Sequence, residues 1–303
     1  MTGLALAIGT FDGVHLGHRS IIDAAQASVG ADGDVMAVTF WPHPLSVLKP
    51  ESAPPLLQGA GAREDALLAA GADEILVLEF TAAFAAEQPG EFVERVLVPL
   101  EPSAVAIGES FTFGARGAGT PETLRQLAAG RFDVITGPTV EVNGCPVSSS
   151  RIRALVQDGG VREAAGLLGR DFAVRGVVVH GDHRGRTLGF PTANLNPPES
   201  LVTPADGVYA GWLRRLDEES GQLMPAAVSV GDNPTFGSSR RVEAHVLDAD
   251  LDLYGVEVEI GFAKWLRGMV AFDGVDQLVA QLRDDVAATR EEMSDSPTIK
   301  GTW

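Results

Sequence analysis

The spacing of the apolar segments constrains this chain most. From residue 1 to residue 170, short apolar runs alternate with segments in which apolar residues recur at helical spacing. Strands are expected at residues 4–8, 35–40, 74–78, 104–107 and 132–136, and helices at 18–29, 63–70, 92–100 and 123–129. This alternation predicts an α/β domain, a parallel sheet with helices on both faces, whose substrates bind beyond the carboxyl ends of the strands.

The pattern changes near residue 170. Short β-rich runs follow at residues 174–179, 208–213, 226–230, 242–247 and 256–262, separated by Gly, Pro and Asp. Such runs favour a small antiparallel β-barrel. A helix comes next, and we expect it to pack on the barrel through an apolar stripe formed by Val275, Leu278, Val279, Leu282 and Val286. The chain is therefore divided into domains 1–170 and 171–303.

Charge and composition exclude several classes of function. The chain carries 23 Lys and Arg against 41 Asp and Glu, a net charge of −18, which disfavours binding to nucleic acid or to an anionic membrane. Cys145 is the only cysteine, so an internal disulfide and a Cys-rich zinc site are excluded. The sequence shows no signal peptide and no apolar run long enough to span a membrane, and we expect a cytoplasmic protein.

The first pattern that indicates chemistry is GTFDGVHLGH, residues 9–18, between the first expected strand and helix. Its glycines allow close approach to a ligand, and the helix start offers free N–H groups and the positive end of the dipole. His15 and His18 can donate hydrogen bonds to phosphate oxygens there. Two alternatives remain at this point: a capping turn with incidental histidines, and a metal site, for which few other ligands lie nearby.

These ten residues resemble the HxGH superfamily of nucleotidylyltransferases, and most closely the bacterial bifunctional riboflavin kinase/FAD synthetase family. Further segments similar to that family are FWPHP at residues 40–44, GESFTFG at 108–114 and SSSRIR at 148–153. The resemblance implies that His15 and His18 hold ATP phosphates during adenylyl transfer. For 40–44 the alternative is a loop held rigid by its prolines.

The segment 148–153 places hydroxyls and an arginine together. Ser149 and Ser150 at a helix start can cap the helix and bind phosphate, and Arg153 can neutralise the leaving pyrophosphate. Capping alone is the alternative for Ser149.

The segment 108–114 is implied to bind flavin through Ser110 and Phe111. Ser110 stands where the family has an amide or a carboxylate. Plain core packing is the alternative for Phe111 and Phe113.

A second pattern, GDHRGRTLGFPTAN, spans residues 181–194. It is a glycine-rich turn with two arginines, followed by a proline-fixed bend that presents a hydroxyl and an amide. The oxygens of Thr192 and Asn194 are hard ligands that suit Mg²⁺ carried by a nucleotide. A hairpin with an ordinary surface Thr and Asn is the alternative.

This pattern also resembles the riboflavin kinase signature, and the similarity continues to residue 290 or so. It includes GVYA at 207–210, GDNPTF at 231–236, VEAH at 242–245 and DLYG at 252–255. The resemblance implies that Thr192 and Asn194 hold Mg²⁺-ATP, that Glu243 is the catalytic base and that Arg267 contacts flavin. Without the resemblance, a strand glutamate such as Glu243 is usually a solvated residue.

The combined expectation is a bifunctional enzyme that uses ATP to phosphorylate riboflavin to FMN and then to adenylylate FMN to FAD. The alternatives are a riboflavin kinase whose first domain has lost adenylylation, and a flavin-binding regulatory protein. Riboflavin, FMN, ATP and Mg²⁺ are the expected ligands, without nucleic acid or membrane. The expected ATP and phosphate contacts are Gly9, Phe11, Gly17, Ser149, Ser150, Gly181, Arg186, Gly189, Thr192 and Asn194.

Overall fold

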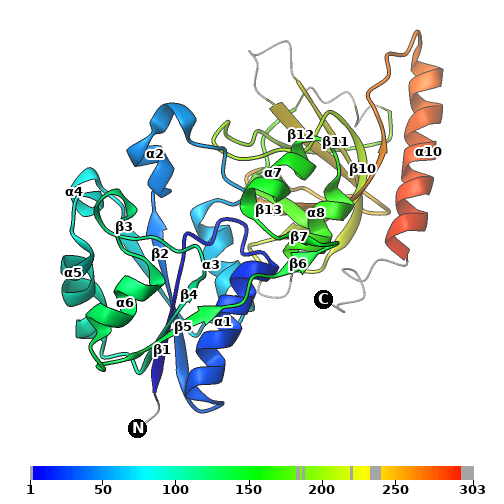
Figure 1. Ribbon diagram of the computed structural model, residues 1–303. Coiled ribbons are helices and arrows are strands. Elements are labelled where there is room, and N and C mark those ends of the chain that lie inside the picture. The colour runs from blue at the N-terminus through cyan, green and yellow to red at the C-terminus, as the bar shows by residue number, and fades with distance from the viewer. Residues whose placement is uncertain (1–2, 182–184, 186–187, 219–220, 233–239, 295–303) are drawn as a thin grey trace. The chain divides into compact units, whose positions relative to one another are not determined.

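The chain forms two compact units, Met1–Ser149 and Ser150–Trp303. The computed structural model describes residues 3–181, 185, 188–218, 221–232 and 240–294 (Figure 1). The division falls after the first residue of helix α7 (Ser149–Gln157) and before α8 (Val161–Leu168), whereas the boundary was expected after residue 170. Helix α8 falls in the second unit because it packs against two strands of that unit, β8 and β13.

The first unit contains the expected parallel sheet, with strand order β3-β2-β1-β4-β5. All four strand pairs are parallel. The strands are β1 (Leu4–Ile8), β2 (Asp34–Trp41), β3 (Glu74–Glu79), β4 (Ala104–Gly108) and β5 (Asp133–Gly137). The order reverses at β1, so the carboxyl end of β1 lies at the point where an open α/β sheet binds its ligand.

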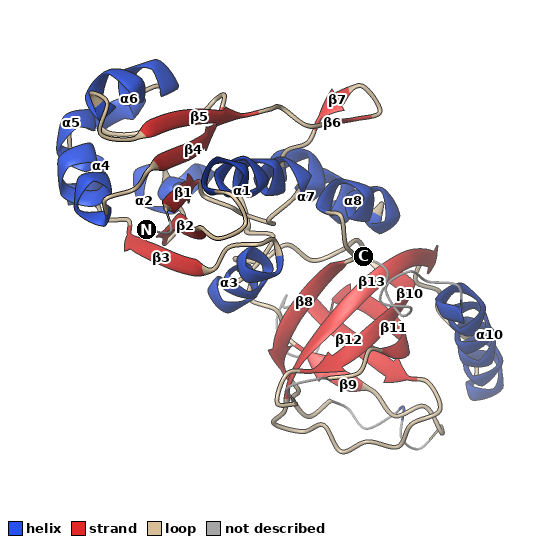
Figure 2. Cartoon of the chain, turned by 90° about the horizontal axis from the view of Figure 1, so that it is seen from below, coloured by secondary structure: helices blue, strands red, loops and turns tan. Residues whose placement is uncertain are grey.

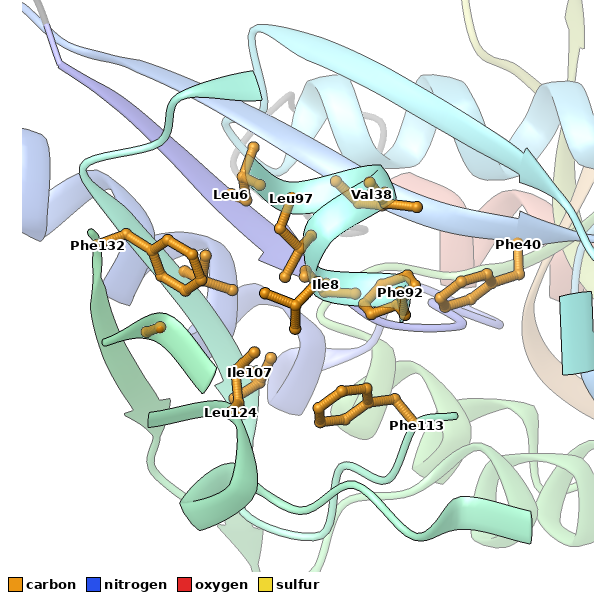
Figure 3. Packing of buried hydrophobic residues seen from close by; sticks show 14 residues of the cluster. Leu6, Ile8, Val38, Phe40, Phe92, Leu97, Ile107, Phe113, Leu124 and Phe132 are labelled. Carbon is orange, nitrogen blue, oxygen red and sulfur yellow. The ribbon is translucent and has the colours of Figure 1, made fainter. Parts of the chain in front are cut away.

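Helices cover both faces of this sheet (Figure 2). The helices of the unit are α1 (Leu16–Val29), α2 (Pro44–Leu48), α3 (Ala60–Ala69), α4 (Ala82–Ala85), α5 (Pro89–Phe92) and α6 (Pro121–Ala128). Successive side chains of β1 point to opposite faces of the sheet and belong to two different hydrophobic cores. Ala5 and Ala7 face Ile22 of α1, and their small side chains let the helix approach the sheet closely. Leu6 and Ile8 face the opposite core, which includes the phenylalanines Phe40, Phe92, Phe113 and Phe132 (Figure 3).

Some local structure differs from the sequence-based expectation. The helix expected over 92–100 is broken into α5, a π-helical turn at Val93–Leu97 and a 3₁₀ turn at Val98–Leu100. Pro99 lacks the N–H that a continuous helix needs at that position. A short hairpin, β6 (Glu141–Val142) and β7 (Cys145–Pro146), was not expected. Asn143 and Gly144 connect its strands, both with positive φ, as a two-residue hairpin turn requires.

The second unit is a curled antiparallel six-stranded sheet, a half-barrel, with strand order β8-β13-β10-β11-β12-β9 (Figure 2). Its strands are β8 (Phe172–Val177), β9 (Ala193–Leu195), β10 (Gly207–Arg215), β11 (Met224–Asp232), β12 (Arg240–Val246) and β13 (Glu257–Arg267). The register of β10 against β13 shifts twice, which bends the pair. Any Cβ on Gly211 would lie 2.0 Å from the carbonyl oxygen of Gly261, so the bend depends on glycine.

Helix α10 (Val275–Ser294) packs against β10, β11 and β13, as expected for the terminal helix. The predicted contact stripe, however, is corrected by the structure. Asp285, Thr289 and Met293 are the buried residues of α10, whereas Val275 is 60% exposed. The rest of the predicted stripe is half-buried. The prediction used only the spacing of apolar residues. It could not identify the ion pair with Arg267 that accompanies the burial of Asp285.

Candidate active sites

The loop at residues 9–18, called here the histidine loop, leaves the carboxyl end of β1 and leads into α1. Phe11, Gly13 and Val14 all have positive φ, of 50°, 89° and 38°. Phe11 and Val14 are fully buried in the core beneath α1, and this burial offsets the unfavourable backbone conformation. Strained backbone held in place by a core is typical of binding loops.

His15 and His18 cap the first turn of α1 reciprocally. The backbone N–H of His18 donates to Nδ1 of His15 at 3.3 Å, and the backbone N–H of His15 donates to Nδ1 of His18 at 3.4 Å. Since both Nδ1 atoms accept, each neutral ring carries its proton on Nε2. Both histidines lie at the start of α1, beside the positive end of the helix dipole, which favours anions.

Two predicted phosphate-binding glycines keep the histidine loop compact. A Cβ on Gly17 would lie 3.2 Å from the ring of His15, and a Cβ on Gly9 would lie 3.0 Å from the ring of Phe11. Both distances are shorter than ordinary van der Waals contacts, so a side chain at either position would displace one of these rings.

Asp12 and Ser149 connect the histidine loop to neighbouring segments. The buried Oδ1 of Asp12 accepts the backbone N–H of Leu57 at 2.9 Å, and the Ser149 hydroxyl donates to the Asp12 carbonyl at 2.8 Å. Sequence reasoning did not single out Asp12. In the second unit, Ser150 is exposed and Arg153 is buried on α7.

The segments at residues 40–44 and 108–114 differ in the solvent exposure of their side chains. His43 is 9% exposed and caps α2, its Nδ1 accepting the backbone N–H of Leu45 at 3.1 Å. Phe113 belongs to the core, as the core-packing alternative proposed. Phe111 stacks on it at 5.8 Å between ring centroids and is half-buried, while Ser110 is exposed. Ser110 and the outer face of Phe111 remain accessible to a ligand.

The second unit has a pocket of about 300 Å³ where β9 pairs with β12. Within that pair, Asn194 lies directly opposite Glu243. The pocket is lined by the predicted residues Thr192, Asn194 and Glu243, together with Gly181. Glu243 is about 50 residues from the other two predicted residues in the sequence. The structure therefore brings the predicted metal-binding oxygens and the predicted base to one cavity.

Local contacts fix the two polar ligands. The amide nitrogen of Asn194, which is 5% exposed, donates to the carbonyl of Thr192 at 3.1 Å and contacts its hydroxyl at 3.3 Å. Nδ1 of His245 contacts the Pro191 carbonyl at 2.8 Å and anchors the bend. Gly181 closes against Asn194, because a Cβ there would lie 2.7 Å from the amide atoms.

Glu243 is not a fully solvated strand residue. Its Oε1 pairs with Nη1 of Arg241 at 3.3 Å, and its side chain is 32% exposed. Glu243 also lines the pocket. A carboxylate on a pocket wall can accept a proton from a bound hydroxyl.

Two further predicted residues, Arg267 and Gly189, are absent from the described pocket lining. Arg267 is bound by both carboxylate oxygens of Asp285, at 2.6 and 2.8 Å, and its Nη1 donates to the Gly268 carbonyl. Gly189 lies in an exposed turn with a φ of 86°. Arg186 lies outside the described residues.

Within the described part of the chain, no three His, Cys, Asp or Glu side chains gather as a metal site.

Comparison with known families covers both units. Residues 1–151 match the family model described as FAD synthetase, and residues 168–293 match the one described as riboflavin kinase. The bifunctional riboflavin kinase/FMN adenylyltransferase of Listeria monocytogenes is 36% identical, over 94% of this chain and 91% of the relative. The chain belongs to this bifunctional family. It phosphorylates riboflavin to FMN and adenylylates FMN to FAD, using ATP in both reactions.

Other relatives agree. The enzymes of the same name from Escherichia coli and Bacillus subtilis are 35% and 32% identical, covering 95% and 92% of this chain and 92% and 89% of the relatives. Because both family models match, the bifunctional enzyme is favoured over a kinase alone.

A solved structure is also similar along the chain. A crystal structure described as a macrolide-efflux protein from Streptococcus pneumoniae is 34% identical, with a TM-score of 0.85, over 95% of this chain and 93% of that one. That description applies to the other protein. Among the described helices of this chain, none has the length and apolar character needed to cross a membrane.

Proposed function

We propose that riboflavin is phosphorylated in the pocket at the β9–β12 pair and that Glu243 is the base. The observation that best supports this proposal is that Glu243 lies opposite Asn194 in the paired strands β12 and β9. Thr192 lines the same pocket. A base and nucleotide ligands on one wall can hold the attacking hydroxyl near the γ-phosphate.

Mg²⁺ fits the donor set of this pocket. Thr192 and Asn194 offer hard oxygens, and the hydrogen bonds of the Asn194 amide nitrogen to Thr192 leave Oδ1 as its acceptor atom. These two residues would hold Mg²⁺ together with ATP, and the ion would neutralise phosphate charge.

The chain's own groups account for the proton transfer. Glu243 accepts the proton of the ribityl hydroxyl of riboflavin. The oxygen of that hydroxyl bonds to the γ-phosphorus of ATP while the bond between the γ-phosphorus and ADP breaks. The ion pair with Arg241 holds the carboxylate in place. Val178, Ala244 and Leu253 supply an apolar part of the pocket wall, which excludes water from the reacting groups.

Adenylyl transfer is assigned to the histidine loop. The FMN phosphate is already an anion, so it attacks the α-phosphorus of ATP without a protein base, and pyrophosphate leaves. The Nε2–H groups of His15 and His18 and the start of α1 stabilise charge on the phosphates. Ser110 and Phe111 contact the flavin. The Oγ of Ser149, which donates to the Asp12 carbonyl, contributes a further polar contact.

Thr192→Val tests the kinase site, because valine keeps the shape of threonine and removes its oxygen. The KM for Mg²⁺-ATP in FMN formation should rise about 10-fold, as for a lost bond to a charged group, and higher Mg²⁺ should partly restore the rate. FAD formation from supplied FMN should not change. An unchanged Mg²⁺ dependence of FMN formation would overturn the ligand assignment.

A further inference from the structure

Arg63, on α3, is a buried arginine that neither sequence pattern nor resemblance singled out. Its side chain is 2% exposed, although arginine is rarely buried so completely. Nη1 donates to the Thr10 carbonyl at 3.1 Å, and Nη2 donates to the Phe40 carbonyl at 3.2 Å. The guanidinium also lies over the ring of Trp41, 5.0 Å from its centroid. One side chain thus contacts the ends of two neighbouring strands.

The two acceptors belong to two different motifs. Thr10 is in the histidine loop, and Phe40 begins the segment at residues 40–44, called here the proline segment. The same Thr10 carbonyl also accepts the hydroxyl of Thr39 at 3.2 Å. Both motifs leave the carboxyl ends of adjacent strands, β1 and β2, where ligands of such sheets bind. The rigid fork of Arg63 therefore fixes the spacing between these two motifs.

Packing alone does not account for an arginine at this position. Burial lowers the pKa of the Arg63 guanidinium, while the charges of Asp12 and Glu64 raise it. Burying a charged group is costly, and an apolar residue of similar volume can fill such a space at lower cost. The planar fork, in contrast, holds two carbonyls at a set separation, which neither an apolar side chain nor a lysine can do.

We propose that Arg63 is a positioning residue for adenylyl transfer, holding the histidine loop at a fixed distance from the proline segment. This inference rests on the proposed role of His15 and His18. Releasing the two carbonyls lets the loop and its Nε2–H donors shift relative to the bound phosphates. Displacement of reacting groups by about 1 Å lowers turnover by about 100-fold.

The test compares Arg63→Met and Arg63→Lys, assayed well below their measured unfolding temperatures. Arg63→Met should lower the kcat of FAD formation from supplied FMN by about 100-fold, with a smaller change in the KM for ATP. Arg63→Lys, which can reach one carbonyl, should recover part of that kcat. FMN formation by the same preparations should not change. A merely structural role predicts a lower unfolding temperature and normal kcat in the folded protein.

Arg95→Met is the matched control, since Arg95 also lies over an aromatic ring, that of Phe84, in the same unit. It should leave FAD formation unchanged, and an equal loss in Arg95→Met would overturn the proposal. If Arg63→Met does not fold, Thr39→Val removes the other donor to the Thr10 carbonyl. It should lower kcat about 3-fold to 10-fold, and a normal kcat would count against the proposal.

His18→Ala, measured in parallel, separates the two levels of the argument. Loss of FAD formation in His18→Ala together with a normal kcat and KM in folded Arg63→Met overturns the role of Arg63 alone. Normal FAD formation in His18→Ala overturns the role of the histidine loop, and the positioning role falls with it.

Discussion

The rings of His15 and His18 stack face to face, with centroids 3.6 Å apart and 12° between their planes. Each Nδ1 accepts the backbone N–H of the other residue. In a neutral ring, these hydrogen bonds favour the tautomer that carries its proton on Nε2, because Nδ1 is the acceptor. The HxGH spacing thus forms the helix cap. The proposed phosphate site uses the same two residues, so the capping and catalytic interpretations are compatible.

His18→Ala should depress FAD formation from supplied FMN by about 100-fold to 1000-fold, the usual cost of one donor to a developing charge. Riboflavin phosphorylation in the same preparation should persist, since that reaction is assigned to the other unit. Rates of both reactions, followed by chromatography of the flavin products, make the comparison. Equal loss of both activities would instead indicate misfolding or a shared site.

Gly181→Ala should impair the kinase. The added Cβ would lie 2.7 Å from the amide of Asn194, which is buried and bonded to Thr192, so the amide must leave its position. We expect kcat/KM for ATP in FMN formation to fall at least about 10-fold, the loss of one bond to a charged group. Gly166→Ala is the matched control, because a Cβ at Gly166 meets no atom within 4 Å. Equal effects of the two changes would contradict the account.

Helix α8 should contribute to the stability of the kinase unit, which places the useful domain boundary near residue 150. A fragment of residues 150–303 and one of residues 171–303 should both make FMN and no FAD. The shorter fragment loses the packing of α8 on β8 and β13, and its thermal midpoint should fall by about 2–4 °C for each kcal/mol lost. Equal midpoints would support the boundary at 170, and FAD production by either fragment would refute the domain assignment.

The Arg267–Asp285 pair should act as an anchor for α10. Asp285→Asn removes one partner of a pair in which Asp285 is 5% exposed, a change that costs about 3–5 kcal/mol in buried pairs. Urea unfolding should show this loss. If Arg267 also contacts flavin, as the family resemblance implies, Arg267→Met should raise the KM for riboflavin more than Asp285→Asn does. Equal effects on KM would restrict Arg267 to the anchoring role.

The sequence predicted the elements whose apolar pattern is simple. All five parallel strands of the first unit occur where the sequence predicted them, because each is a short apolar run between turn residues. The half-barrel strands were also found, with the exception of β9, which has only three residues. That short strand is what brings Asn194 opposite Glu243, so the pocket was predicted as a set of residues but not as a geometry.

What the sequence could not supply depends on tertiary contacts. Arg63 has an unremarkable place in a helical pattern, and only the fold brings its guanidinium to the carbonyls of Thr10 and Phe40. The most deeply buried residues of α10 were missed for a similar reason, although four of the five predicted residues are half-buried. Asp285 is a polar residue in the sequence, and its burial follows from Arg267, 18 residues away.

The most direct test of the account is Glu243→Gln, which keeps the shape of the side chain and removes the proton acceptor. Both reactions should be measured on one preparation, beside the matched variant Glu257→Gln at an exposed strand position. The account predicts that Glu243→Gln lowers riboflavin phosphorylation about 100-fold to 10,000-fold, with FAD formation from supplied FMN unchanged and Glu257→Gln silent. Near-normal FMN formation by Glu243→Gln would contradict it.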